Sequence, residues 1–119
     1  MIELRARVRD ALAGVCGELV YGDPADGAGR ERICWRESAN RCHARADGEE
    51  YLAELNYTLE IFSPSAEGAA ALRDAADERM RRAGFRREAA AEQFEGEIGL
   101  CHVTARYRAL ADGEGNIYQ

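Results

Sequence analysis

Lysine is absent from this sequence of 119 residues, and all 16 of its basic residues are arginine. This absence excludes the phosphate-binding loop of nucleotide hydrolases, in which a lysine contacts the phosphates. Long apolar stretches are also lacking, and none approaches the roughly 20 residues that a membrane-spanning helix needs. Aromatic residues make up only 8% of the chain, so we expect a thin core of aliphatic side chains and alanine.

The basic residues are outnumbered by 22 acidic ones, which gives a formal net charge of -6. This sign is wrong for a protein that binds nucleic acid by neutralising phosphates. Hydrophobic residues make up 46% of the chain and charged residues 32%, a balance typical of a folded domain. The first residues show no apolar stretch typical of a signal peptide. We therefore expect one cytoplasmic domain.

Four irregularly spaced cysteines do not indicate a disulfide framework, which a chain of this size does not need. We expect free, mostly buried thiols. The dipeptides Cys42-His43 and Cys101-His102 leave a zinc site as an alternative. Zinc ligands usually stand about two to four residues apart, whereas adjacent strand residues point to opposite faces. Each dipeptide would offer one ligand, so we expect no metal and no cofactor.

The first half of the chain predicts a helix and three strands. Apolar residues recur at spacings of three and four over Ile2–Val15, as on an amphipathic helix. A short strand is expected at Leu19–Tyr21, and turn-forming residues then predict a loop over 22–30. Alternation predicts strands at Arg32–Glu37 and Tyr51–Phe62. The polar stretch between them, residues 38–50, is either a long hairpin loop or an extension of both strands.

The second half predicts another helix and two strands. Ser63-Pro64-Ser65 offers a serine N-cap, with Pro64 suited to the first helical position, and Gly84 ends the helix. A strand begins at Phe85–Arg87, and Glu88–Glu97 is a loop or a fragment of helix. The last strand, Ile98–Leu110, alternates between residues such as Cys101 that face inward and residues such as His102 that face outward.

The expected fold is an α+β sandwich of two layers, with a mostly antiparallel sheet covered on one face by two helices. The elements follow the order α-β-β-β-α-β-β. Residues 1–111 form the single domain, and residues 112–119 form a flexible C-terminal tail.

The sequence offers little for catalysis. Only His43 and His102 are ordinary bases near neutral pH, and we expect both to be solvated surface residues. The glycine motifs of serine hydrolases and of dinucleotide-binding proteins are missing. The carboxylate pairs, Glu49 with Glu50 and Glu95 with Glu97, are more typical of a solvated edge than of an acid–base pair. We therefore predict that the protein is not an enzyme.

Five arginines gather at the end of the second predicted helix and just beyond it: Arg79, Arg81, Arg82, Arg86 and Arg87. Two uses are open for this cluster. It complements the helix dipole and pairs with nearby acids, or it forms a patch for an acidic partner, because the rigid fork of arginine suits protein interfaces.

The order of several short motifs is similar to that of a known family. In chain order they are Leu19-Val20-Tyr21-Gly22, Ile33-Cys34-Trp35-Arg36-Glu37 with Asn40, Asp47-Gly48-Glu49-Glu50, Ile61-Phe62-Ser63, Gly84-Phe85-Arg86-Arg87, His102 and Arg106-Tyr107. Over nearly the whole chain this order resembles the small tail completion or tail terminator proteins of long-tailed phages and prophages.

The resemblance implies a subunit like the lambda-type terminator, whose six-membered ring caps the tail tube and meets the head-side connector. It implies no catalytic residues. The implied partners are further copies, the tail tube protein and the connector protein, while DNA passes through without specific binding. The implied location is the host cytoplasm during assembly and then the virion. Two alternatives are a head-side stopper or adaptor, and a small cytoplasmic enzyme or ligand-binding domain.

Residues 38–50 and 88–97 are long polar segments through which such a ring protein would reach the tube or the connector. The candidate interface residues are Asn40, Arg41, Arg45, Asp47, Glu49, Glu50, Glu92 and Glu95. A heterologous interface that repeats closes a ring, so a subunit with a thin core gains stability from its neighbours. The acidic balance suits a channel that DNA crosses without being held.

Overall fold

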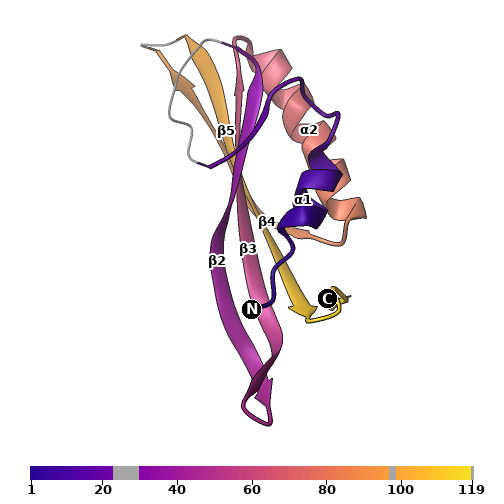
Figure 1. Cartoon of the computed structure of the whole chain (residues 1–119). Helices are drawn as coiled ribbons and strands as arrows, with labels where there is room; N and C mark the ends of the chain where they lie inside the picture. Colours follow the sequence, from indigo (N-terminus) through magenta and orange to yellow (C-terminus); the bar gives the residue numbers. More distant parts are fainter. Residues whose placement is uncertain (23–29, 97–98, 119) are drawn as a thin grey trace.

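The computed structural model describes residues 1–22, 30–96 and 99–118. Its elements are α1 (Arg5–Leu12), β1 (Leu19–Tyr21), β2 (Arg32–Ala46), β3 (Glu49–Ser63), α2 (Ala66–Arg82), β4 (Arg86–Glu95), β5 (Leu100–Asp112) and β6 (Ile117–Tyr118). Within these residues the strands form one sheet in the order β1-β2-β3-β5-β4, with β6 paired to β5. Both α1 and α2 lie on one face of the sheet (Figure 1). The predicted α+β sandwich is confirmed.

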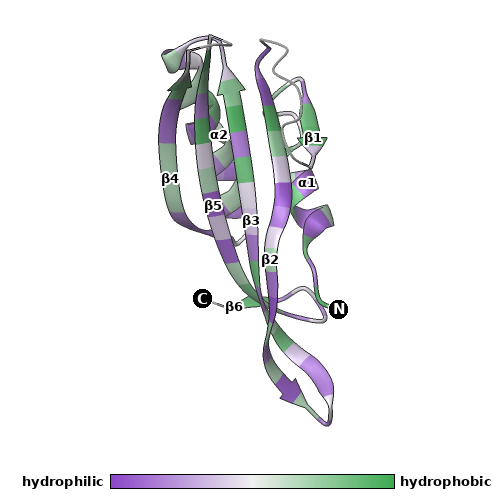
Figure 2. Ribbon diagram, turned by 90° about the vertical axis from the view of Figure 1, so that its left-hand side faces the viewer, coloured by the Kyte–Doolittle hydropathy of each residue, from purple (hydrophilic) through white to green (hydrophobic). Residues whose placement is uncertain are grey.

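The sheet is antiparallel except where β1 pairs with β2 in parallel. The molecule measures 52 × 24 × 21 Å, because β2 and β3 are each 15 residues long. Their hairpin projects beyond the other strands, as Figures 1 and 2 show. The face of the sheet that turns away from α1 and α2, called the open face below, is the one toward the viewer in Figure 2.

The alternation of β3 and β5 places the core between the sheet and the helices. Residues of β3 such as Leu55, Leu59 and Ile61 are fully buried there. The predicted stripe of α2, Ala69, Leu72, Ala76 and Met80, faces them and is buried as well. Full burial of a large aliphatic side chain stabilises a fold by about 1.5–3 kcal/mol, so these stripes decide where both helices lie.

The N-terminal segment is tied to the sheet by Tyr57. The Tyr57 hydroxyl accepts a hydrogen bond from the Leu4 backbone N–H at 2.8 Å and donates to Glu37 Oε1 at 3.0 Å. Burial raises the pKa of Tyr57 well above its ordinary value, so the hydroxyl keeps the proton that it donates. Helix α1 has eight residues and no side-chain cap, and this anchor compensates for its short length.

The chain over residues 38–50 extends the flanking strands, which decides between the two predicted alternatives. Only Asp47 and Gly48 separate β2 from β3, and both have positive φ, 53° and 80°. A two-residue hairpin turn with positive φ at both positions matches the twist of its strands. Register shifts at 37/39 and 42/44 each leave one extra residue on β2, and a third at 44/45 leaves Tyr51 extra on β3. These shifts break the alternation, so the sequence shows no regular period there.

The prediction of a loop or helical fragment over Glu88–Glu97 is wrong. Strand β4 runs to Glu95 and pairs with β5 along its whole length. The run Ala89–Ala91 has the intrinsic preference of a helix rather than a strand, and pairing with β5 overrides this preference. Residues 97–98 lie outside the described part of the chain, as does most of the predicted loop over 22–30.

The C-terminal segment differs from the expected tail. The chain turns after Asp112, and Ile117 and Tyr118 pair with β5 as β6. Asp112 accepts hydrogen bonds from the Tyr118 hydroxyl and the Asn116 side chain, and these lower its pKa to about 2. Turn residues alone do not reveal such pairing. Strand β5 ends two residues later than predicted, at Asp112, and α1 is shorter at both ends.

Both ends of α2 follow the predicted residues closely. The Ser65 side chain caps the helix by accepting from the Gly68 N–H at 2.9 Å, and Pro64 precedes this cap instead of occupying the first helical position. At the other end the Phe85 N–H donates to the Met80 carbonyl at 3.0 Å. Gly84 between them has a φ of 103°, a conformation that favours glycine.

We expect Gly84→Ala to lower the free energy of unfolding by about 1–3 kcal/mol, because a side chain at this φ is strained. The new Cβ would also lie 2.9 Å from Ile117 Cδ1 of β6. Urea denaturation measures the loss. The matched control is Gly17→Ala, which meets no atom within 4 Å and has no positive φ, so a change within about 0.5 kcal/mol is expected. Equal losses in both variants would contradict this reading of Gly84.

Candidate functional site

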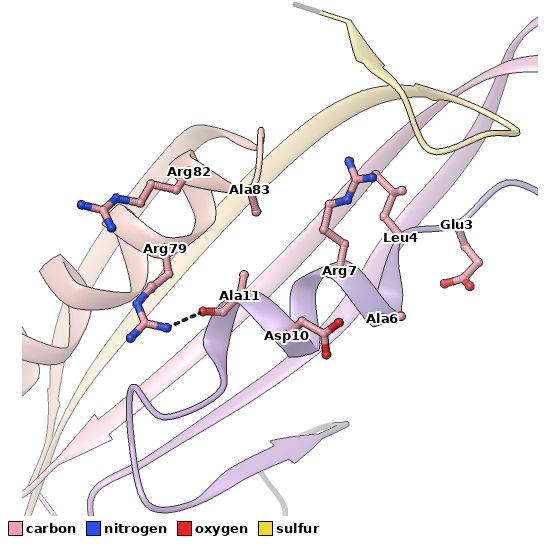
Figure 3. Close-up of a pocket in the computed structure, with 9 residues that line it drawn as sticks. All are labelled: Glu3, Leu4, Ala6, Arg7, Asp10, Ala11, Arg79, Arg82 and Ala83. Atoms are coloured by element: carbon pink, nitrogen blue, oxygen red, sulfur yellow. Dashed lines mark hydrogen bonds between the residues drawn. The ribbon is translucent and has the colours of Figure 1, made fainter.

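An open groove of 620 Å³ lies between α1 and the end of α2 (Figure 3). Arg79 joins the two helices, because its Nη1 donates to the carbonyl oxygens of Ala11 at 3.3 Å and Ala13 at 3.2 Å. Arg7 and Asp10 lie along the groove with Arg79. Small-molecule sites are mostly apolar and enclosed, so this charged groove is better suited to contact with another protein.

Asp77 of α2 contacts two arginines of the cluster and one tyrosine. Its carboxylate accepts a hydrogen bond from the Tyr107 hydroxyl at 2.8 Å and forms ion pairs with Arg81 Nε at 3.2 Å and Arg87 Nη1 at 3.1 Å. The Asp77 side chain is only 15% exposed. Burial and the bond to Asp77 raise the pKa of Tyr107. Tyr107 and Arg87 therefore hold α2 against β5 and β4, while Arg81 pairs with Asp77 within α2.

The other arginines of the cluster are more accessible. Arg82 pairs with Glu78 one turn earlier at 2.6 Å, and both side chains are more than half exposed. Exposed pairs of this kind contribute little stability. Arg86 is exposed and forms no ion pair within the described residues. Pairing with acids thus accounts for Arg81, Arg82 and Arg87, and Arg86 is the member best placed for a partner.

We expect Arg87→Glu to lower the free energy of unfolding by about 1–2 kcal/mol, because it places a second carboxylate beside the half-buried Asp77. Arg86→Glu makes the same charge change one residue earlier on an exposed position and serves as the control. Its expected effect is within about 0.5 kcal/mol. Chemical denaturation of both variants compares them, and a larger loss for Arg86→Glu would sink this division of roles.

A polar cluster that the sequence did not predict lies on the open face. Glu60 of β3 accepts from the Thr104 hydroxyl at 2.7 Å and from Arg36 Nη1 at 3.3 Å, and lies 2.8 Å from His102 Nε2. Burial alone would raise the pKa of Glu60, but the hydrogen bonds from Thr104 and His102 outweigh burial and lower it. The carboxylate is therefore held in its charged form.

His102 is 8% exposed, so the prediction of a solvated surface residue is wrong. Its ring stacks on Phe62 with centroids 4.3 Å apart and an interplanar angle of 16°. On the next strand, the Arg32 guanidinium carbon lies 4.3 Å from the Phe62 ring centroid, a cation–π contact. Gln93 Nε2 on β4 lies 3.2 Å from His102 Nδ1. This column links all four long strands.

The column also contains a buried polar atom without a protein partner. Arg32 is 5% exposed, and its Nη1 has no hydrogen-bond partner within the described residues. The neighbouring Cys34 thiol is buried with Phe62 and Leu100 in a second, small apolar cluster, and burial raises its pKa. Cys34 is therefore a protonated packing residue and not a reactive thiolate.

The chemistry of this cluster does not match a nucleophilic relay. In such a relay, the hydroxyl and the orienting carboxylate contact opposite nitrogens of the histidine. Here Thr104 Oγ1 at 3.4 Å and Glu60 Oε1 at 2.8 Å both lie near His102 Nε2, and Thr104 donates to Glu60 directly. The arrangement is a cross-strand clamp that fixes neighbouring strands in register.

The signal for this clamp is present in the alternation of the chain. Glu60 falls on the outward side of one predicted strand, and His102 and Thr104 fall on the outward side of another. The sequence does not say that these strands are neighbours in this register, Glu60 beside Thr104. Without that information, each residue resembles a solvated surface residue.

We expect stability to fall below the ordinary carboxyl pKa of 4.5, because the folded pKa of Glu60 lies lower. The unfolded chain then binds more protons, so the free energy of unfolding falls as pH drops through the folded pKa. Glu60→Gln removes this titration and should lose less stability between about pH 6 and pH 3. Urea denaturation across this pH range measures the free energy of unfolding. The control is Glu114→Gln, which makes the same change in net charge at an exposed site. An unchanged acid slope in Glu60→Gln would refute the assignment.

The predicted interface residues of the hairpin have two different roles. Asn40 Nδ2 donates to the Ile2 carbonyl at 2.7 Å, and Glu50 accepts from the Ile2 N–H at 3.0 Å, so both hold the N-terminal segment. Arg41 pairs with Glu54 at 2.6 Å across the hairpin. Nearer the turn, the exposed residues are Arg45, Asp47 and Glu49. The turn end of the hairpin is the accessible part.

The two predicted residues of the other polar segment lie on β4. Glu92 is exposed and stands 3.8 Å from Arg73 of α2. Glu95 ends β4, and its side chain lies outside the described part of the structure. Both belong to an edge strand and not to the predicted loop.

The cysteine–histidine dipeptides do not come together as a site. Cys101 packs against the core on the helix side of β5, and His102 lies on the open face, as expected of adjacent strand residues. Cys42 and His43 are exposed on β2. Over residues 1–22, 30–96 and 99–118, no three histidine, cysteine, aspartate or glutamate side chains are grouped to hold a metal ion.

Neither of two further observations supplies an identity. No helix in the described residues has the length and apolar character needed to cross a membrane. No model of a known protein family and no curated protein matches this sequence.

Proposed function

We propose that this protein is a structural subunit of phage tail assembly, a tail terminator or tail completion protein that forms a ring. The ring would cap the tail tube and join it to the head-side connector. The observation that carries this proposal is the β2–β3 hairpin, which projects beyond the rest of an elongated subunit (Figure 1). The residues of its turn end, 45–49, are exposed and include Arg45, Asp47 and Glu49, which suits contact with the next component of a stacked assembly.

Two further properties support an assembly role over a chemical one. The polar cluster around Glu60 clamps strands together instead of forming a relay, and the groove between α1 and α2 is open and charged. The order of short motifs along the chain, which resembles that of tail terminators, supports the particular kind of assembly. The α+β sandwich agrees with the fold that this resemblance implies.

In this proposal the partners are further copies of the chain, the tail tube protein and the head-side connector protein. DNA would pass through the ring without specific binding. Arginines of the open face support this passage, because Arg36 pairs with Glu60 and Arg108 pairs with Glu54. A guanidinium that is neutralised by a carboxylate gains less from a phosphate. The protein would act in the host cytoplasm during assembly and then remain in the virion at the head–tail junction.

We expect the purified protein to form a six-membered ring of about 79 kDa, six times the 13.1 kDa subunit. Multi-angle light scattering over a concentration series measures the mass, and negative-stain electron microscopy shows the ring and its lumen. Mass action favours the ring as concentration rises. A strict monomer at every concentration, including in the presence of tail tube protein, would overturn the proposal.

Position in the particle separates this function from that of a head-side stopper or adaptor. Antibody labelling of separately purified heads and tails is expected to mark the end of the tail that receives the head. Labelling of heads alone would refute the terminator role while leaving a ring-forming connection protein in place. The ring measurement and the labelling thus test two different parts of the proposal.

A further inference from the structure

Strand β4 forms one long edge of the sheet (Figure 2). One side of β4 pairs with β5, and no strand among the described residues pairs with its outer side. After a bulge at 87/89, β4 runs from Ala89 to Glu95 without a register shift. This stretch has no proline, no lysine and no bulge, the devices that usually protect an edge from pairing. Phe94 within it is 68% exposed.

The opposite edge is formed mainly by β2. Strand β1 covers only Ile33–Trp35, so the outer side of β2 from Arg36 to Ala46 pairs with no strand of the described chain. The exposed charged and titratable residues here are Arg41, His43 and Arg45. Between Ser38 and Ala46 the sequence contains no acidic residue. One edge of the sheet is therefore basic over this length.

The charges of the two edges are complementary. The only charged residues in Ala89–Glu95 are Glu92 and Glu95, both acidic. Pairing β4 with a second β4 would bring like charges together, whereas pairing β4 with the basic edge of β2 brings opposite charges together. Opposite charges on paired strands are favourable, and like charges directly opposite are destabilising. The charge pattern therefore favours the β2 edge of a second copy over its β4 edge.

The strand directions also match. Strand β4 is antiparallel to β5, β5 to β3, and β3 to β2, so β4 is antiparallel to β2. A second copy in the same orientation would present its β2 to β4 in the direction that continues the antiparallel ladder. The two copies can then be related by a rotation that keeps the strand direction, and repeating a rotation that closes on itself gives a ring.

We propose that the outer edge of β4 binds the outer edge of β2 from a second copy of this chain. The copies then share one continuous antiparallel sheet, and main-chain hydrogen bonds supply the contact. Because the two edges differ, the contact is heterologous and repeats from copy to copy until a ring closes. This inference rests on the proposed function in one respect, since it assigns the contact between ring subunits.

The positions of the two edges define the geometry of the ring. Strand β4 pairs with Leu100–Arg108, the first part of β5. The free part of β2 pairs with the region of β3 that leads to Arg106–Asp112, the last part of β5. Neighbouring copies are thus displaced along the strands at each step. The strands of the ring are then tilted to its axis, as closed sheets require.

Charge at the middle of β4 tests the contact. Ala91 is exposed and lies opposite Thr104 on the open face, so a long side chain there displaces no core residue. Ala91→Arg faces the basic β2 edge with a like charge and is expected to weaken assembly about tenfold or more. Ala91→Glu adds equal bulk with the favourable sign and should assemble as the unchanged protein does. Light scattering measures both, and circular dichroism verifies folding. Equal effects of the two variants would overturn the inference.

Crosslinking tests which edges meet. Ala91→Cys adds a thiol on β4, and Cys42 supplies an exposed thiol on β2. In a background with Cys16→Ser and Cys101→Ser, whose thiols are otherwise free and half-buried, a flexible bismaleimide should link copies into a ladder that ends at the closed ring, because each copy then has two accessible thiols at different positions. The control variant, Ala91→Cys with Cys42→Ser, should give no ladder. Dimers that persist in this control would show β4 pairing with β4 and overturn the inference.

The outcomes separate this inference from the proposed function. Rings seen by microscopy without a crosslinked ladder would refute the β4–β2 contact and leave the ring function standing. If the crosslinked ladder forms but antibodies against the protein label no tails, the phage function is refuted and the β4–β2 contact stands. Failure of every variant and of the unchanged protein to assemble would refute both.

Discussion

The fold depends on the burial of one face of β3 and β5 beneath α1 and α2. The two helices have 8 and 17 residues, whereas β2 and β3 have 15 residues each at the greater rise of a strand. The helices therefore cover only part of the length of the sheet, and the hairpin end of β2 and β3 extends beyond them (Figure 1). Everything outside this overlap needs another source of stability, from polar contacts or from a neighbouring molecule.

The open face meets this need with paired polar groups. The clamp at Glu60 and the column of Arg32, Phe62 and His102 cross from strand to strand. Buried ion pairs add little net stability, because desolvation offsets their attraction. Their effect here is on register, since a slip of one residue would separate every pair and expose the core face of β3. The open face thus specifies which residues are neighbours more than it adds to the free energy of unfolding.

Local periodicity predicts the helices and strands that bury a continuous apolar stripe. It fails where pairing with a distant strand determines the secondary structure. The apolar stripe of α2 and the alternation of β3 appear in the sequence because each lies against one neighbour layer. The bulges of β2 break its alternation, and Ala89–Ala91 of β4 has the preference of a helix until β5 pairs with it. The burial of His102 likewise depends on Phe62, which is 40 positions earlier in the chain. These are non-local facts that a single sequence does not contain.

The sequence also does not show which charged side chains pair within the subunit and which can contact a neighbouring copy. Asp77 pairs with Arg81 within α2 and with Arg87 of β4, so these arginines stabilise the subunit. On the two edges, Arg41 pairs with Glu54 and Glu92 stands 3.8 Å from Arg73, whereas Arg45 forms no ion pair among the described residues and is exposed. Three register shifts make the β2 edge irregular, which lowers its affinity for an arbitrary strand. A regular acidic edge and an irregular basic edge would select each other through charge, and two different edges favour a closed ring over a symmetric pair.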